Sequence, residues 1–308
     1  LYDPPIRVAE EFAMLDCISG GRLVAGFPVG SAMDTAYGYG ANPALLRDKY
    51  AEAEELILKA WTEKEIFSFD GKYNQLRYVN IWPRPMQDPR PPVWVPGAGS
   101  IETWNHCIET GHLYAYLSYS GYKRGKQVMD GFWKVANAAG VDNTYHAGFL
   151  QLVCIADNEE ELHEKYAAHT EYFFNKMLHV YPGFSDPPGY RTVDTIKAGL
   201  LAQTTTFGRA SDHEATFDEL RESGNVVAGT PEQVTEQLRS IAKDLRSGHL
   251  MLLNQFGSIP HELAKENIRR TAQEVVPNLR DMWSEYEDHW WPQNAIVRDA
   301  TPAPTPAD

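Results

Sequence analysis

The stretch PVWVPGAGSIETWNHCIET, residues 92–110, decides how this chain folds. A short apolar run breaks at Gly97 and Gly99, and Ser100 then opens a helix-like segment. The first N–H groups of a helix have no partner inside it, and with the helix dipole they attract anions. Ser100 can cap the helix and give its hydroxyl to a phosphate, while glycines let the backbone approach a ligand. The stretch predicts a phosphate site, with an ordinary strand, turn and cap as the alternative.

Composition excludes several classes of function. The 308 residues are 43% hydrophobic and 12% aromatic, enough for one large α/β domain or two modest ones. A net charge of −14 with no basic run repels nucleic acid and anionic membranes. No apolar run approaches the roughly 18 residues of a membrane span, and no signal pattern opens the chain. We therefore expect a globular cytoplasmic protein that binds neither nucleic acid nor membrane.

The cysteines and histidines give no sign of a metal site or a disulfide. Cys17, Cys107 and Cys154 are odd in number, far apart and set among apolar residues, as is usual for reduced core thiols. The ten histidines show neither HExxH nor another metal-ligand spacing. We expect no metal.

Apolar periodicity divides most of the chain into alternating strands and helices, which predicts a parallel sheet. The predicted strands are residues 22–27, 93–95, 113–120, 146–156, 226–229 and 249–254. The predicted helices are residues 5–18, 43–63, 101–110, 121–139 and 261–279, with others that begin after Asn158 and Thr230. Residues 28–42 are expected to form a loop. Five or six parallel strands are fewer than the eight of a closed barrel.

Three segments depart from this alternation. Residues 65–92 form an excursion with a hairpin signal at Asp70 and Gly71 and alternation over residues 73–81. Residues 181–215 are irregular and rich in proline and glycine, as in an inserted loop or a mobile lid. Residues 292–308 hold little to bury and are expected to be disordered.

From about residue 5 to about residue 280, the order of short motifs resembles the bacterial luciferase-like flavin-dependent monooxygenases. The motifs are RVAEE (7–11), ISGGR (18–22), RDKY (47–50), PGAGS (96–100), GTPEQV (229–234), FGSIP (256–260) and EVVP (274–277). The resemblance implies an α/β fold, the TIM (β/α)8 barrel of the luciferase-like type with insertions. In that mapping residues 22–27 are the fourth barrel strand, so residues 1–291 would form an N-terminally truncated barrel whose first three strands are absent. Exposed parallel edges then predict either that the natural protein is longer, or that this fragment is unstable or associates as a homo-oligomer.

The resemblance also implies where a cofactor's phosphate is held. Ser100 matches the family's phosphate-binding serine, and Gly97 and Gly99 match the glycines that clear space for it. Thr103, one turn further on, is the candidate for a second hydroxyl, with a helix-surface threonine as the alternative.

Other candidates lie elsewhere in the chain. Lys49 and Tyr50 match a basic residue and tyrosine that reach the phosphate or ribityl chain, although Tyr50 also falls on the apolar face of its helix. Gly26 ends the strand that approaches the flavin ring in the family. Tyr119 is a candidate for contact with substrate or flavin, with packing as the alternative. The catalytic residues stay unassigned.

The activity implied by the resemblance is that of an FMN-dependent monooxygenase, an enzyme that oxygenates a small organic substrate with O2. Reduced FMN would come from a separate flavin reductase, bound transiently, since no second nucleotide-binding fingerprint is present. In such enzymes the cofactor carries the hard chemistry and the protein supplies a dry, shaped cavity, which agrees with the lack of a catalytic triad. The alternatives are a deazaflavin-dependent oxidoreductase on the same fold and a non-catalytic flavin-binding relative.

Overall fold

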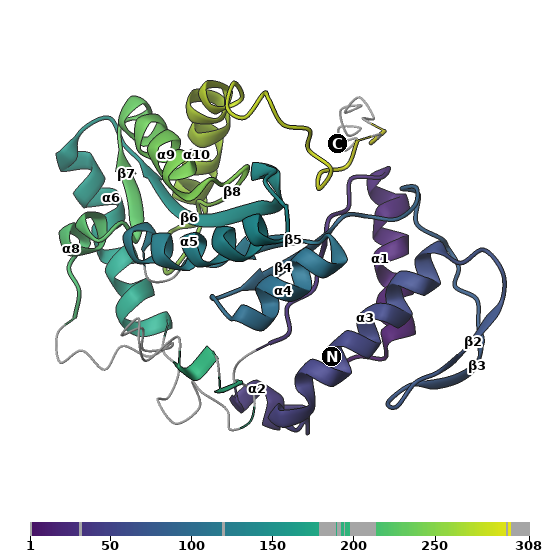
Figure 1. Ribbon diagram of the computed structural model, residues 1–308. Helices are drawn as coiled ribbons and strands as arrows, with labels where there is room; N and C mark the ends of the chain where they lie inside the picture. Colours follow the sequence, from purple (N-terminus) through teal and green to yellow (C-terminus); the bar gives the residue numbers. More distant parts are fainter. Residues whose placement is uncertain are drawn as a thin grey trace, which may run out of the picture. The chain divides into compact units, whose positions relative to one another are not determined.

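The chain divides into two compact units, each described by itself (Figure 1). The first unit comprises Leu1–Ala25, Leu46–Val93 and Trp291–Asp308, and the second comprises Gly26–Leu45 and Trp94–Trp290. This computed structural model describes residues 2–30, 33–118, 121–178, 189, 192–193, 195–197, 214–293 and 295–296.

The first unit is built on two helices, α1 (Pro5–Ser19) and α3 (Leu46–Thr62). Proline at the start of α1 suits the first helical turn, and Gly20 ends the helix at φ 73°, in the left-handed region that favours glycine. Ala9 on α1 is completely buried, and its carbonyl accepts a hydrogen bond of 2.9 Å from the indole of Trp61 on α3. Small residues on α1 thus give space to a large aromatic residue on α3.

The predicted hairpin within residues 65–92 is confirmed. Strands β2 (Phe67–Asp70) and β3 (Gln75–Val79) are antiparallel, with Asp70 opposite Gln75. The second strand begins at residue 75 and not at 73, because the backbone N–H groups of residues 72–74 turn toward the Glu52 carboxylate instead of the partner strand. A side chain on α3 therefore sets the length of the turn.

Within the described residues, six strands form one sheet in the order β1-β4-β5-β6-β7, with β8 also paired to β6. Strands β4, β5, β6, β7 and β8 are joined by parallel pairings, which confirms the predicted parallel sheet. The strands are β1 (Ala25–Gly26), β4 (Val93–Gly97), β5 (Leu113–Tyr116), β6 (Ala147–Ile155), β7 (Val226–Gly229) and β8 (His249–Leu253). The eight-stranded closure and the loss of three N-terminal strands stay predictions.

Strand β6 organises this sheet. Gly148 pairs with both Ala115 and His249, so β5 and β8 lie on opposite edges of β6. Leu152 pairs with both Val226 and Leu253, so β7 and β8 also lie on opposite edges. Strands β5 and β7 therefore share one edge of β6, one after the other.

On its other edge, β6 runs beyond the end of β8, and a side chain replaces the missing strand. The completely buried Asn267 accepts a hydrogen bond of 3.1 Å from the Ile155 N–H and donates one of 2.7 Å to the Val153 carbonyl. Buried backbone groups need such partners. The side-chain amide of Asn267 thus takes the place of a strand along the part of β6 that β8 does not reach.

Most predicted helices are confirmed, and two helical segments and one strand differ from the prediction. Residues 28–42 hold a short helix, α2 (Met33–Gly38), where a loop was expected. Strand β1 is shorter than residues 22–27 because the Gln87 side chain, and not a strand, bonds the Leu23 carbonyl at 2.7 Å. The closing helix is broken into α10 (His261–Arg270), η5 (Thr271–Val275) and η6 (Val276–Leu279), because Pro277 has no N–H to continue the α-helical pattern. The remaining helical segments are η1 (Pro43–Leu45), α4 (Ile101–Thr110), α5 (Tyr122–Ala138), η2 (Thr144–His146), α6 (Glu159–Tyr172), η3 (Phe173–Met177), α8 (Phe217–Glu222) and α9 (Pro231–Leu245).

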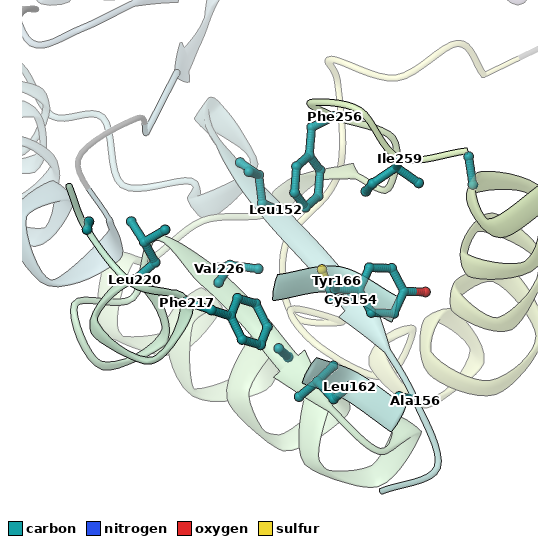
Figure 2. Packing of buried hydrophobic residues seen from close by; sticks show 13 residues of the cluster. Leu152, Cys154, Ala156, Leu162, Tyr166, Phe217, Leu220, Val226, Phe256 and Ile259 are labelled. Atoms are coloured by element: carbon teal, nitrogen blue, oxygen red, sulfur yellow. The ribbon is translucent and has the colours of Figure 1, made fainter. Parts of the chain in front are cut away.

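A buried apolar cluster packs around the carboxyl-terminal half of β6 (Figure 2). Tyr166 from α6 and Phe217 from α8 meet Leu152 and Cys154 of β6 there. The cysteines are free, and Cys107 and Cys154 are buried as predicted, whereas Cys17 is half-buried. The three cysteines therefore form no disulfide with one another.

The residues after η6 cover the amino ends of the strands in the second unit. The Trp290 ring stacks on His146 at 4.6 Å between ring centroids, and its indole N–H donates to the Gly111 carbonyl at 2.8 Å. The Trp94 indole donates in turn to the Trp290 carbonyl at 2.9 Å. This segment thus covers the amino ends of β4, β5 and β6.

Candidate functional site

The candidate site is the connection between β4 and α4, at the carboxyl end of the parallel sheet. Ser100 is extended (φ −87°, ψ 138°) and caps α4, its hydroxyl accepting from the Thr103 N–H at 3.3 Å. The hydroxyl oxygens of Ser100 and Thr103 are 2.8 Å apart. Two predicted residues are thus brought together at a helix N-terminus, where the dipole favours an anion.

Both predicted glycines of this turn are required by local geometry. Gly99 has φ +105°, and a Cβ there would lie 2.9 Å from Cγ1 of Val128 on α5. A Cβ at Gly97 would lie 3.0 Å from the Tyr114 ring and 3.2 Å from the methyl of Thr103. Packing and backbone conformation therefore account for these glycines, and their role in clearing space for a ligand stays a prediction.

The turn rests on a buried aromatic layer. Tyr114 of β5 is completely buried and stacks on Phe132 of α5 at 4.9 Å between centroids. Burial raises the pKa of the Tyr114 hydroxyl well above its ordinary value, although the Trp104 indole and the Gly99 N–H act in the opposite direction. Tyr114 therefore stays neutral and forms a rigid, uncharged base for the turn.

The first turn of α4 also carries a carboxylate, that of Glu102, which bonds to another segment of the chain. Glu102 accepts a hydrogen bond of 2.6 Å from the hydroxyl of Thr195, and another from that of Thr192. These residues belong to the irregular segment predicted as a loop or lid, most of which lies outside the described residues. Within the described part, Glu102 attaches that segment to the start of α4.

The helices that follow β6 and β7 begin differently. Asn158 caps α6, and three glutamates occupy its first turn. Thr230 caps α9 in a reciprocal arrangement with Gln233, and Pro231 is the first residue, as predicted. A capping side chain and a first-turn carboxylate are thus common to α4, α6 and α9, and α4 differs from the other two by the paired hydroxyls of Ser100 and Thr103.

Two further predicted residues, Lys49 and Tyr50, lie on α3. Tyr50 is 7% exposed, and its hydroxyl donates to Glu54 at 3.0 Å, in accord with the packing alternative. The ammonium group of Lys49 lies 5.7 Å from the centre of the Tyr73 ring. Both belong to the first unit, whereas Ser100 belongs to the second.

Two further predictions concern the strand ends. Gly26 is exposed, and a Cβ there would meet no atom within 4 Å of the described structure. Packing therefore does not explain this glycine, and its contact with a flavin stays a prediction. Tyr119 lies outside the described residues.

The acidic surface over α8 and α9 is less suited to an anionic cofactor. A groove of about 830 Å³ lies there, bordered by Asp218, Glu222, Glu232 and Glu236 with the single cation Arg221. Close by, His163 lies 3.1 Å from Asp218, and Arg221 pairs with both Asp218 and Glu159. Ion pairing explains this cluster, and the expected lack of a metal stays a prediction.

Sequence reasoning missed two residues that shape the site, Tyr114 and Glu102. Tyr114 was seen only as part of a buried strand, and its position under the turn depends on the β4–β5 register, in which Val95 is its partner. Glu102 was visible as an acidic residue in a first helical turn, but its threonine partners lie about ninety residues later. Neither contact leaves a local signal.

Residues 1–247 match the family described as luciferase-like monooxygenase. Two uncharacterised proteins of Sinorhizobium fredii are related: y4wF, 25% identical over 71% of this chain and 64% of its own length, and y4vJ, 30% identical over 91% and 75%. The oxygenase component of the flavin-dependent trigonelline monooxygenase of Acinetobacter baylyi is 23% identical over 89% and 72%. The chain thus spans about two thirds to three quarters of these relatives.

Solved structures establish the fold. The monooxygenase RslO1 of Streptomyces bottropensis aligns with a TM-score of 0.67 at 19% identity, over 90% of this chain and 74% of its own. The oxygenating constituent of 3,6-diketocamphane monooxygenase from Pseudomonas putida, solved with FMN, aligns with 0.67 at 18%, over 90% and 76%. An F420-dependent secondary alcohol dehydrogenase aligns with 0.60 at 19%, over 90% and 76%.

Among the described residues, no helix is long and apolar enough to span a membrane.

Proposed function

The chain belongs to the luciferase-like monooxygenase family, and from that premise we propose that it binds FMN with the phosphate at the N-terminus of α4. The observation that carries the proposal is the pair of hydroxyls of Ser100 and Thr103, 2.8 Å apart at that N-terminus. Hydroxyl groups and first-turn N–H groups are the donors that a phosphate needs.

The residues present fit this cofactor. Gly99, at φ +105°, brings the backbone to the cap without a side chain in the way. Tyr114 supports the turn from the buried side as a neutral group, so no negative charge arises beneath the phosphate. The Glu102 carboxylate is engaged by threonine hydroxyls of the segment around residue 195. Ser100 and Thr103 would therefore hold the phosphate in a fixed position.

When reduced, the bound flavin supplies the reaction with O2, and the protein's part is to bind, orient and exclude water. A phosphate held at the strand ends would fix the ring system relative to the sheet, which is positioning by remote binding energy. We further propose that a separate reductase supplies the reduced cofactor and that the substrate is a small organic molecule. The trigonelline enzyme, named as an oxygenase component, supports the first of these points.

A second candidate is a deazaflavin-dependent oxidoreductase, because an F420-dependent alcohol dehydrogenase has the same fold. The two functions differ in their use of oxygen. We expect the purified chain to take up O2 when supplied with reduced FMN and a flavin reductase. Oxidation of an alcohol with F420, without O2 uptake, would favour the second candidate.

The phosphate site itself is tested by comparing FMN with riboflavin, which lacks the phosphate. We expect Ser100→Ala to weaken FMN binding about tenfold or more, the loss of a hydrogen bond to a charged group, and to leave riboflavin binding unchanged. The matched control is Thr230→Ala, which removes the cap of α9 and should cost a similar stability, about 0.5–2 kcal/mol, without affecting FMN. Equal affinity of the wild type for FMN and riboflavin would contradict the proposed site.

A further inference from the structure

A buried hydroxyl just beyond β5 has no partner within the described structure. Ser118 is 2% exposed, and its Oγ makes no hydrogen bond there. A buried polar group without a partner costs about 1–3 kcal/mol, so such groups are uncommon and call for an explanation. One explanation is a ligand that supplies the missing partner.

The sheet register places Ser118 beside the candidate phosphate turn. Tyr116, the last residue of β5, pairs with Gly97, and the N–H of Leu117 donates to the Gly97 carbonyl at 3.0 Å. Ser118 follows the end of β5 by two residues, as Gly99 follows the end of β4 by two. The backbone of Ser118 therefore lies just beyond the carboxyl end of the strand that pairs with β4.

Strand periodicity gives the direction of the side chain. Residues two apart share a face of a strand. Tyr114 packs against Trp104 of α4 and Phe132 of α5, and a Cβ at Gly125 of α5 would lie 2.9 Å from the Tyr116 ring. Tyr114 and Tyr116 thus face the helices, and Ser118 is the next residue in the same two-residue spacing, just past the end of β5.

We propose that the Ser118 hydroxyl donates a hydrogen bond to the phosphate monoester held by Ser100 and Thr103. This inference rests on the proposed function and adds a third hydroxyl to the site, from a different strand. A neutral hydroxyl suits the position because it can be buried without the cost of an unpaired charge. The ligand supplies the acceptor that the described structure lacks.

The chain offers a matched control at the other end of the sheet. Thr144 is 1% exposed, and its hydroxyl also has no partner within the described structure. It lies in η2, directly before β6, and so at the amino ends of the parallel strands. Removal of either hydroxyl deletes a buried polar group, but Ser118 follows the carboxyl end of a strand whereas Thr144 precedes the amino end of one.

The test measures dissociation constants for FMN and riboflavin with wild type, Ser118→Ala, Ser118→Cys and Thr144→Val, with thermal unfolding as a folding check. We expect Ser118→Ala to weaken FMN binding about fivefold to tenfold and to leave riboflavin unchanged. Ser118→Cys, with a weaker donor of similar shape, should lie between wild type and Ser118→Ala. Thr144→Val should bind FMN as the wild type does.

The outcomes separate this inference from the proposed function. If Ser100→Ala loses FMN affinity while both Ser118 variants retain it, the role of Ser118 is overturned and the phosphate site stands. If the wild type does not prefer FMN to riboflavin, the site and the role of Ser118 are both overturned. An equal loss of FMN affinity in Thr144→Val would assign the effect to general destabilisation and overturn the inference as well.

Discussion

The hydroxyl oxygen of Ser100 lies 2.8 Å from that of Thr103, at the N-terminus of α4. A hydrogen bond between two hydroxyls uses one of their two protons. Ser100 also accepts from the Thr103 N–H, so the pair is held in one arrangement before any ligand binds. Preorganised donors bind an anion more tightly than mobile ones, because less conformational entropy is lost.

Thr103→Val should weaken FMN binding by about threefold to tenfold, because it removes one hydroxyl of the pair with little change in shape. The matched control is Thr110→Val in the last turn of the same helix, where the hydroxyl donates only to the His106 carbonyl. Titration of flavin fluorescence measures both variants. An unchanged FMN affinity in Thr103→Val would show that Ser100 binds the phosphate without this partner.

Gly99→Ala should destabilise the fold by about 1–3 kcal/mol from backbone strain alone, and further because the new methyl group would lie 2.9 Å from Val128. Gly140→Ala separates the two causes, since Gly140 has φ +78° but no atom within 4 Å of a Cβ there. Urea denaturation compares the free energies of unfolding. If the two variants lost the same free energy of unfolding, Val128 would have moved to accommodate the methyl group, and backbone strain would account for the whole loss.

Asn267→Leu should lower the free energy of unfolding by about 1–3 kcal/mol for each buried backbone group that loses its partner. The affected groups are the Ile155 N–H and the Val153 and Asn254 carbonyls. Asn278→Ala is the control, because this exposed side chain bonds only the Glu274 carbonyl. If both variants unfold alike, the amide of Asn267 does not act as the edge of the sheet.

The hairpin of the first unit should lose stability in acid. Burial alone would raise the pKa of Glu52, but hydrogen bonds from Asn74, Tyr73 and Lys72 outweigh it and hold that pKa below its ordinary value. A lowered folded pKa gives stability that is fully present above the unfolded pKa, about 4.3, and is lost as the pH falls through the folded value.

Glu52→Gln should therefore be less stable than the wild type at neutral pH, and the gap should narrow as the pH falls below about 4. Hydrogen exchange of the backbone amides of residues 72–74 measures this locally. Glu55→Gln, an exposed carboxyl on the same helix, should leave that exchange unchanged. If the difference in stability between the wild type and Glu52→Gln did not change with pH, the charge of the Glu52 carboxylate would not be its cause.

Prediction from the sequence succeeded where neighbouring residues decide the outcome. The cap at Ser100, the first helical residue Pro231 and the hairpin after Asp70 all follow from local chemistry, and the structure has each of them. It failed where a distant group replaced the expected partner, as Gln87 does beside Leu23. The extent of β1 therefore could not be predicted from its own residues.

The sequence by itself determined the alternation of strands and helices, the parallel sheet and the turn from Gly97 to Ser100, because apolar periodicity, glycine and capping residues act within a few positions. Only the tertiary structure decided that Tyr114 lies beneath that turn, that Glu102 bonds threonines near residue 195, and that Asn267 completes the edge of β6. Each of these contacts joins distant parts of the chain, and depends on strand register and helix packing. The same register pairs the last residue of β5, Tyr116, with Gly97, which is why the proposal for Ser118 depends on the folded chain.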